Sequence, residues 1–299
     1  MKKILVYHYD AFSDMPNKGN PAGVVVGDEY LTDKQMQEIA NKVGFNETAF
    51  VVKSQKANLG IRYFTPGHEM NLCGHATVAT LFCLKSRGML GDIDSLTIET
   101  KAGIIPIDLI EQDKNIRILM GQNTPQFKTY QGTLEKLADL LGISVADINS
   151  SLPVMYASTG TWTLLVPIAK LSTFSRMVPK TDLFPSFLAD IPTSSIHPFC
   201  METMKPYAHM HSRHFSSPYS GTIEDPVTGT ASGAMGAYYV TYINPNTYKL
   251  ELIMEQGQEI NRDGEVSVSV NKQGVRIEVK ISGTAVYVKD IIIEYKNLT

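Results

Sequence analysis

The feature of this 299-residue sequence that most constrains its fold is a weak two-fold internal repeat. The two copies are RYFTPGHEMNLCGHATVATLFCL (62–84) and RHFSSPYSGTIEDPVTGTASGAMGAYYV (213–240). Each copy opens with Arg-X-Phe, has a proline shortly after, reaches a glycine in a tight turn (Gly74 or Gly229) and continues into small and apolar residues. The two copies start 151 residues apart (213 − 62), a spacing far longer than the period of a solenoid. It predicts an α+β protein of two similar domains, each with a sheet rolled around one central helix.

The runs of small residues are expected to form the central helices. Residues 76–88 (ATVATLFCLKSRG) are almost wholly small or apolar, and a helix that is apolar all round is normally buried on every side. Residues 31–44 differ, because their apolar positions recur at helical spacing on one face. We expect Thr32 to cap this amphipathic helix together with Gln35, three residues later.

A domain boundary is expected near GQNTPQF (121–127), where Gly, Asn and Pro cluster. The first domain is then 1–120, and the second is 121–285 with a further helix at 134–144. The C-terminal strand, 286–299, is available to complete the first domain.

Charge and cysteine content restrict the partners of the chain. The net charge is −3 and no long run of Lys or Arg occurs, so neither nucleic acid nor a membrane is an expected partner. The apolar stretch in MKKILVYHYDAFSD is broken by His8 and Asp10, which makes it too short and polar for a signal peptide or a membrane span. The three cysteines follow no pattern that indicates disulfides. The expected location is the cytoplasm.

The two glycine turns predict an anion site. If each turn leads into a helix, free backbone N–H groups point outward there. An exposed helix N-terminus favours an anion by ~0.3–1 kcal/mol per charge. We expect a small carboxylate substrate or an enolate-like intermediate to bind. The ionisable residues near these turns are Glu69, Cys73, His75, Glu224 and Asp225. Glu47, with Phe45 and Phe50 as apolar neighbours, is a further candidate for a general base.

Five stretches, spread over nearly the whole chain, carry a resemblance to a known family. They are DAFSDMPNKGNPAGVV (10–25), FNETAFV (45–51), RYFTPGHEMNLCGHATVA (62–79), EDPVTGTASGA (224–234) and EQGQEINRDG (255–264). In this order they resemble the PhzF-like family of the diaminopimelate epimerase and proline racemase superfamily. The resemblance implies a diaminopimelate epimerase-like fold with the active site in the cleft between the two domains. It also implies isomerase chemistry without metal or organic cofactor, and a homodimer.

The resemblance also implies roles for individual residues. Glu47 in NETAF matches the general base of the family. The other polar active-site positions of the family match His75, Asp225 and Thr230. At the position of Thr230, better-known members have Ser. The positions that hold the substrate match Asn20, Cys73, Gly74 and Gly229.

Cys73 leaves the type of isomerase open. Superfamily racemases use two cysteines, one on each turn, but the second turn here offers Thr228, whose hydroxyl is far too weakly acidic to act as a thiolate does. We therefore expect a single-base proton shift on one face of a small carboxylate. One alternative is an amino-acid racemase or epimerase that uses Cys73 with Glu47. Another is a small-molecule binding protein without turnover.

A metal site is not expected from the histidines. His68 and His75 flank Cys73, and HMHSRH (209–214) supplies three more imidazoles. A structural zinc site needs about four ligands, and neither CxxC nor HExxH spacing is present to supply them.

Overall fold

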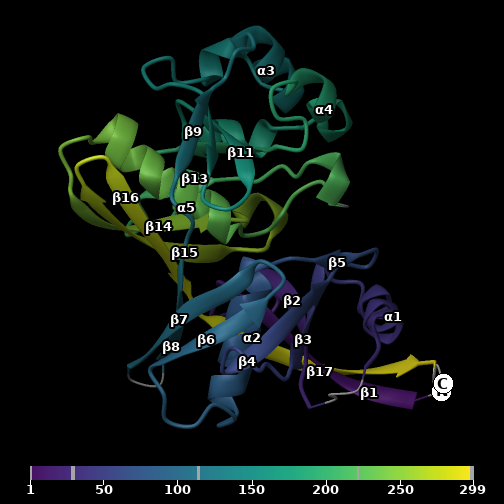
Figure 1. The fold of residues 1–299 in the computed structure, drawn as a ribbon. Coiled ribbons are helices and arrows are strands. Elements are labelled where there is room, and N and C mark those ends of the chain that lie inside the picture. The colour runs from purple at the N-terminus through teal and green to yellow at the C-terminus, as the bar shows by residue number, and fades with distance from the viewer. Residues whose placement is uncertain (1, 28–30, 113–114, 221, 297–299) are drawn as a thin grey trace. The chain divides into compact units, whose positions relative to one another are not determined.

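The computed structural model describes residues 2–27, 31–112, 115–220 and 222–296, and these divide into two compact units. Unit 1 comprises Met1–Gly121 with Ser282–Thr299, and unit 2 comprises Gln122–Ile281. Figure 1 shows the helices and strands of each unit. The last three residues of the predicted C-terminal strand, 297–299, lie outside the described residues.

The division differs slightly from the boundaries that we expected. Residues 282–285, which the sequence placed in the second domain, belong to unit 1. Their backbone explains why: the N–H of Phe12 donates to the carbonyl of Thr284 at 2.8 Å, and Ala285 pairs with Ala11. The C-terminal segment therefore joins the first strand of the chain before residue 286.

Unit 1 contains a mixed sheet. In spatial order its strands are β17 (Ala285–Tyr295), β1 (Lys2–Ala11), β2 (Asn20–Val25), β3 (Glu47–Val52), β4 (Leu59–Phe64), β6 (Ser95–Thr100), β7 (Gly103–Gln112) and β8 (Asn115–Gly121). The β2–β3 and β4–β6 pairs are parallel, and the other pairs in this order are antiparallel. The short strand β5 (Glu69–Met70) also pairs with β4.

Unit 2 repeats this succession of pairings. Its strands are β9 (Gln126–Thr129), β10 (Met155–Ser158), β11 (Trp162–Pro167), β12 (Ser195–Cys200), β13 (Met210–Ser212), β14 (Lys249–Gln256) and β15 (Gly264–Gln273). The next strand in the sequence is β16 (Arg276–Gly283), whose last two residues belong to unit 1. The β11–β12 and β13–β14 pairs are parallel, and β9–β10, β10–β11, β12–β13 and β14–β15 are antiparallel. The repeat found in the sequence is thus a repeat of sheet topology.

Each unit has a helix of small residues packed on its sheet. In unit 1 this is α2 (Gly74–Ser86), which contacts β1, β2, β3, β8 and β17 and is buried at most positions (Figure 1). In unit 2 it is α5 (Gly229–Tyr238), which contacts β10 and β15 and continues into a π-helical turn, Tyr239–Ile243. Its approach to β15 requires a glycine, because a Cβ on Gly236 would lie 2.6 Å from Cγ1 of Val268.

Other helices cover further parts of the two sheets. In unit 1, α1 (Asp33–Val43) begins at Thr32 with the predicted capping box to Gln35, and it packs with apolar residues of β1, β2 and β3. In unit 2, α3 (Leu134–Leu141) and the single turn α4 (Phe184–Phe187) pack with residues of β10, β11 and β12. Within the described residues, no helix combines the length and the apolarity that crossing a bilayer requires.

Candidate active site

The first residue of β3, Glu47, is the predicted general base. It follows the end of α1, where Gly44 adopts a left-handed conformation (φ 72°), and in the parallel β2–β3 pair it lies beside Ala22. Its side chain is 13% exposed. The main chain therefore holds this carboxylate at the end of a buried strand, where a ligand can still reach it.

Two more of the predicted residues stand at the start of α2. Cys73 is the N-cap residue and His75 is the second residue of the helix. The carbonyl of Cys73 accepts hydrogen bonds from the backbone N–H of Thr77 at 3.0 Å and from its hydroxyl at 2.7 Å. Tyr63 of β4 lies 2.6 Å from the same hydroxyl, so the sheet fixes the first turn of the helix.

Glu47, Cys73 and His75 form one cluster, which we call the Glu47 cluster. Nε2 of His75 lies 3.1 Å from Oε2 of Glu47, and Nδ1 of His75 lies 3.4 Å from Sγ of Cys73. Oε2 of Glu47 is buried and accepts no hydrogen bond of good geometry from the described residues, so its contact with His75 is that of an ion pair. A carboxylate, an imidazole and a thiol thus meet in unit 1.

The electrostatics of this cluster favour a charged imidazole. Burial alone would lower the pKa of His75, but the neighbouring Cys73 and Glu47 outweigh it and hold the pKa of the imidazole well above its usual range. Burial raises the pKa of the Cys73 thiol, and the nearby charge of Glu47 raises it further. The arrangement is therefore suited to a carboxylate base in contact with an imidazolium.

Two predicted substrate-holding residues lie beside this cluster. Asn20 is fully buried at the start of β2, two residues before Ala22, the partner of Glu47 in the sheet. Gly74 is the first residue of α2, and a Cβ built on it would meet no atom within 4 Å. The space beside the Cα of Gly74 is therefore open.

In unit 2 the predicted Asp225 lies in the turn that precedes α5. Its Oδ2 accepts a hydrogen bond from the hydroxyl of Thr228 at 2.5 Å. Gln256, at the end of β14, donates through Nε2 to the carbonyl of Asp225 at 2.7 Å and accepts through Oε1 from the N–H of Thr228 at 3.2 Å. The sequence reasoning missed Gln256, which is 2% exposed and joins both ends of this turn.

Gly229 and Thr230 are the first two residues of α5, as the repeat predicts. Gly229 is buried and Thr230 is half-buried. The carbonyl of Thr230 accepts a hydrogen bond from the hydroxyl of Thr159 at 2.9 Å. The loop after β10 thereby holds the start of α5.

A second interaction that the sequence reasoning missed occurs in both units. In unit 1, Arg62 makes two hydrogen bonds to Glu69, at 2.7 and 2.8 Å, and its guanidinium lies 5.2 Å from the ring centre of Phe64. In unit 2, Arg213 binds Glu224 at 2.9 and 2.6 Å and lies 4.7 Å from the ring centre of Phe215. The Arg-X-Phe motif was noted in both copies of the repeat, but not its acidic partner. These forked ion pairs hold the strand before each helix to the segment that leads into it.

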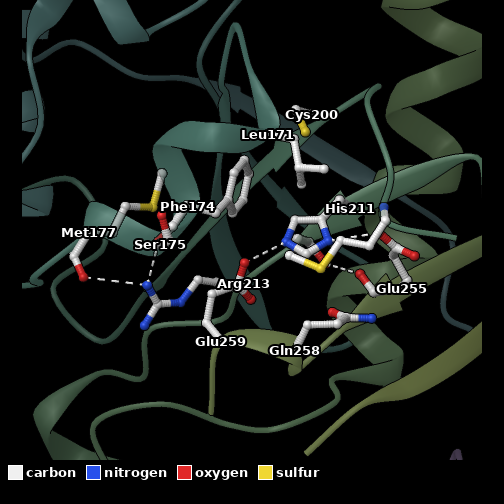
Figure 2. A network of polar contacts seen from close by, with 12 residues as sticks. Leu171, Phe174, Ser175, Met177, Cys200, His211, Arg213, Glu255, Gln258 and Glu259 are labelled. Carbon is white, nitrogen blue, oxygen red and sulfur yellow. Dashed lines mark hydrogen bonds and ion pairs between the residues drawn. The ribbon is translucent and has the colours of Figure 1, made fainter. Parts of the chain in front are cut away.

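Unit 2 also contains a buried network around His211 (Figure 2). Nδ1 of His211 lies 2.9 Å from Glu255, and Nε2 lies 3.0 Å from Glu259. Burial lowers the pKa of His211, but the two carboxylates outweigh it and raise the pKa. Glu255 and Gln256 are consecutive residues of β14. Glu255 contacts the His211 network, and Gln256 contacts the turn before α5.

The histidines considered as metal ligands do not gather. His68 and His209 are exposed, and they contact Thr65 and the backbone N–H of Ile253. His211 binds the two glutamates of its network. Nδ1 of His214 instead lies 3.0 Å from Nδ1 of His197. Within the described residues, the group of three or more His, Cys, Asp and Glu side chains that lie close enough to share an ion is Glu47, Cys73 and His75.

Comparison with known families gives one match over nearly the whole chain. A sequence model of the phenazine biosynthesis-like proteins, PhzC-PhzF, matches residues 9–290. An uncharacterised isomerase of Bacillus subtilis is 52% identical, over 96% of this chain and 97% of the relative. A trans-2,3-dihydro-3-hydroxyanthranilate isomerase of Pseudomonas aeruginosa is 29% identical, over 92% of this chain and 93% of the relative.

Solved structures show the same fold. A phenazine biosynthesis protein of the PhzF family from Bacillus anthracis superposes with a TM-score of 0.96 at 53% identity, covering 99% of this chain and 100% of that one. A hydroxyproline epimerase from Agrobacterium vitis superposes with a TM-score of 0.65 at 10% identity, covering 98% of this chain and 91% of that one. The second likeness is one of fold alone.

Proposed function

This chain belongs to the family of phenazine biosynthesis-like proteins, PhzC-PhzF, and from that premise we propose that it moves a proton within a small carboxylate substrate, with Glu47 as the single base. The observation that carries this proposal is the contact between Oε2 of Glu47 and Nε2 of His75 at 3.1 Å. A base must be held ionised and within reach of the substrate, and an adjacent imidazolium at a half-buried carboxylate meets both needs.

The reaction is a proton transfer on one face of the substrate. Glu47 removes a proton from an acidic C–H bond, and the negative charge that develops is stabilised by the backbone N–H groups at the start of α2. His75 orients the carboxylate of Glu47 and can carry a proton to or from it. The protonated Glu47 then returns the proton to another carbon of the same substrate, which shifts a double bond.

The substrate class follows from the chemistry beside Glu47. A helix N-terminus with open space at Gly74 suits a carboxylate, and the carboxylate makes an adjacent or conjugated C–H bond more acidic. The Pseudomonas aeruginosa relative is named for a cyclic dihydro-hydroxyanthranilate, which is a carboxylate of this kind. We propose that the substrate is a small carboxylate of the same general class.

The further elements of the proposal concern unit 2 and the assembly. Asp225 and Thr230 are proposed to contribute to catalysis, and Gly229 to binding, as the family pattern implies. We also propose a cytoplasmic homodimer that needs no metal or organic cofactor for turnover. Size-exclusion chromatography with light scattering measures the assembly directly.

A second candidate function is favoured by one specific contact. Sγ of Cys73 lies 3.4 Å from Nδ1 of His75, so a thiol contacts the same imidazole as the base. In a racemase or epimerase, Glu47 removes a proton and Cys73 delivers one. The raised pKa of the Cys73 thiol agrees with a donor of protons rather than an acceptor.

Deuterium uptake in D₂O tests the proposal. Wild-type protein and Glu47→Gln are incubated with small amino, hydroxy and cyclic diene carboxylates, and carbon-bound exchange is read by mass spectrometry and NMR. We expect exchange or isomerisation in the wild type and its loss in Glu47→Gln. The control is Glu111→Gln, which changes a half-exposed glutamate paired with Lys85 and leaves the Glu47 cluster intact. Tight ligand binding without exchange, unchanged by Glu47→Gln, contradicts the proposal and supports a binding protein.

A further inference from the structure

The Glu47 cluster has the donor set of a transition-metal site. It offers a thiol sulfur, an imidazole nitrogen and a carboxylate oxygen, and the three ligand atoms lie within 4.8 Å of one another. Soft sulfur and borderline nitrogen donors favour Zn²⁺ and similar ions over Mg²⁺ or Ca²⁺, which prefer oxygen alone. The nature of the donors therefore selects thiophilic divalent cations.

The spacing of the donors is compatible with one shared ion. Tetrahedral coordination at ~2.0–2.3 Å places neighbouring ligand atoms between about 3 and 4 Å apart. Nε2 of His75 lies 3.1 Å from Oε2 of Glu47 and 3.9 Å from Sγ of Cys73. Cys73 and His75 share the first turn of α2 and Glu47 begins β3, so we expect side-chain rotations to bring the three atoms around one centre.

Two further observations indicate that the site can be occupied. Oε2 of Glu47 is buried and has no hydrogen-bond donor of good geometry among the described residues. Gly74 lies between Cys73 and His75 in the chain and the space beside its Cα is open, so we expect room for a fourth ligand, a water molecule or a substrate carboxylate. Three protein ligands with an open fourth position form a complete set for Zn²⁺.

We propose that Glu47, Cys73 and His75 bind a thiophilic divalent cation such as Zn²⁺, and that the bound ion blocks the site. The ion takes Oε2 of Glu47 and a ring nitrogen of His75, the same atoms that the proton transfer needs. Binding and turnover therefore exclude each other. This inference goes beyond the proposed function and does not depend on it, because ion binding is measured without a substrate.

The test uses metal-free full-length protein and Co²⁺ as a spectroscopic substitute for Zn²⁺. We expect one equivalent of Co²⁺ to bind and to give the near-ultraviolet sulfur-to-cobalt absorption of a thiolate ligand, which one equivalent of Zn²⁺ removes. Cys73→Ser should lose this absorption. Loss of a residue that only supports a metal ligand weakens metal binding by ~10–100-fold. We expect a larger loss of Zn²⁺ affinity when a ligand itself is replaced, as in Cys73→Ser, Glu47→Gln and His75→Gln. Titration calorimetry against a competing chelator gives the affinities, and Mg²⁺ should not bind.

Two matched controls separate this site from other thiols and imidazoles. Cys200→Ser changes a buried cysteine of unit 2, and His209→Gln changes an exposed histidine. Both should bind Co²⁺ and Zn²⁺ as the wild type does. Absence of the absorption in folded wild type, its persistence in Cys73→Ser, or its loss in either control overturns the inference. If a substrate is found, Zn²⁺ should also stop exchange until a chelator removes it, and a failure of the exchange experiment leaves the binding result unaffected.

Discussion

Thr228 occupies at the start of α5 the position that Cys73 occupies at the start of α2. The residues around them align without a gap, EMNLCGHAT (69–77) with EDPVTGTAS (224–232). Both are N-cap residues with extended backbone, φ −137° and ψ 118° at Cys73 and φ −117° and ψ 99° at Thr228. Each carbonyl accepts two hydrogen bonds from the residue four positions later, one from its N–H and one from its hydroxyl. The two turns share a backbone and differ in the chemistry of their side chains.

This difference predicts the effect of removing the thiol. If Glu47 is the single base, Cys73→Ala should change kcat/KM by less than ~10-fold, because no thiol takes part in the proton transfer. A loss of ~10²–10⁴-fold, typical of a missing acid or base, contradicts the single-base mechanism and supports the racemase. Cys200→Ala, which removes a buried thiol of unit 2, is the matched control. Deuterium uptake and chiral chromatography of the product distinguish the two reactions.

His75 is predicted to be needed for turnover in its charged form. The pKa of its imidazole is held above the usual range, so the imidazolium that contacts Glu47 is present at neutral pH and is lost as the pH rises through the raised value. The activity of the wild type should therefore fall on the alkaline side. His75→Gln should lower kcat by ~10²–10⁴-fold and should lack that alkaline limb. The exposed His68→Gln should keep both the rate and the limb, and equal profiles for wild type and His75→Gln contradict the assignment.

Gln256 is predicted to position the turn before α5. Replacement by Met keeps the length of the side chain but leaves the carbonyl of Asp225 and the N–H of Thr228 without their partners. Loss of a buried partner costs about 1–3 kcal/mol of the free energy of unfolding. Urea denaturation measures that loss, and Gln273→Met, at the exposed end of β15, is the control. An unchanged unfolding midpoint in Gln256→Met means that the amide does not hold the turn.

Much of this architecture is predictable because it depends on short-range patterns. The capping box of Thr32 and Gln35 and the buried helices of small residues are encoded within a few residues of one another. The start of α2 is less clear from the sequence, since the helix begins at Gly74, two residues before the predicted range. No side chain caps it, and the hydroxyl and N–H of Thr77 bind the carbonyl of Cys73 instead.

The interactions that the sequence did not indicate depend on pairing between distant strands. Gln256 reaches Asp225 because β14 lies beside β13 in parallel register, and no local pattern specifies that register. The same holds for His211, whose partners Glu255 and Glu259 lie more than forty residues later in the chain. Family resemblance indicated Glu47 and His75, but the thiol contact of His75 becomes visible only when helix and strand are placed together.

The pair of His197 and His214 predicts that the protein loses stability in mild acid. Burial lowers the pKa of His214 to about 4 and that of His197 well below its usual range, so the folded protein keeps both rings neutral. In the unfolded chain each imidazole takes up a proton near pH 6.5. The stability that the neutral rings contribute is therefore fully present above that pH and is lost as the pH falls toward 4. For His214 alone the loss is about 3 kcal/mol. His214→Gln should therefore flatten the decline of the unfolding midpoint between pH 6.5 and 4, measured by thermal denaturation, whereas the exposed His209→Gln should leave it unchanged. The same decline in His214→Gln and wild type rules out this pair as its source.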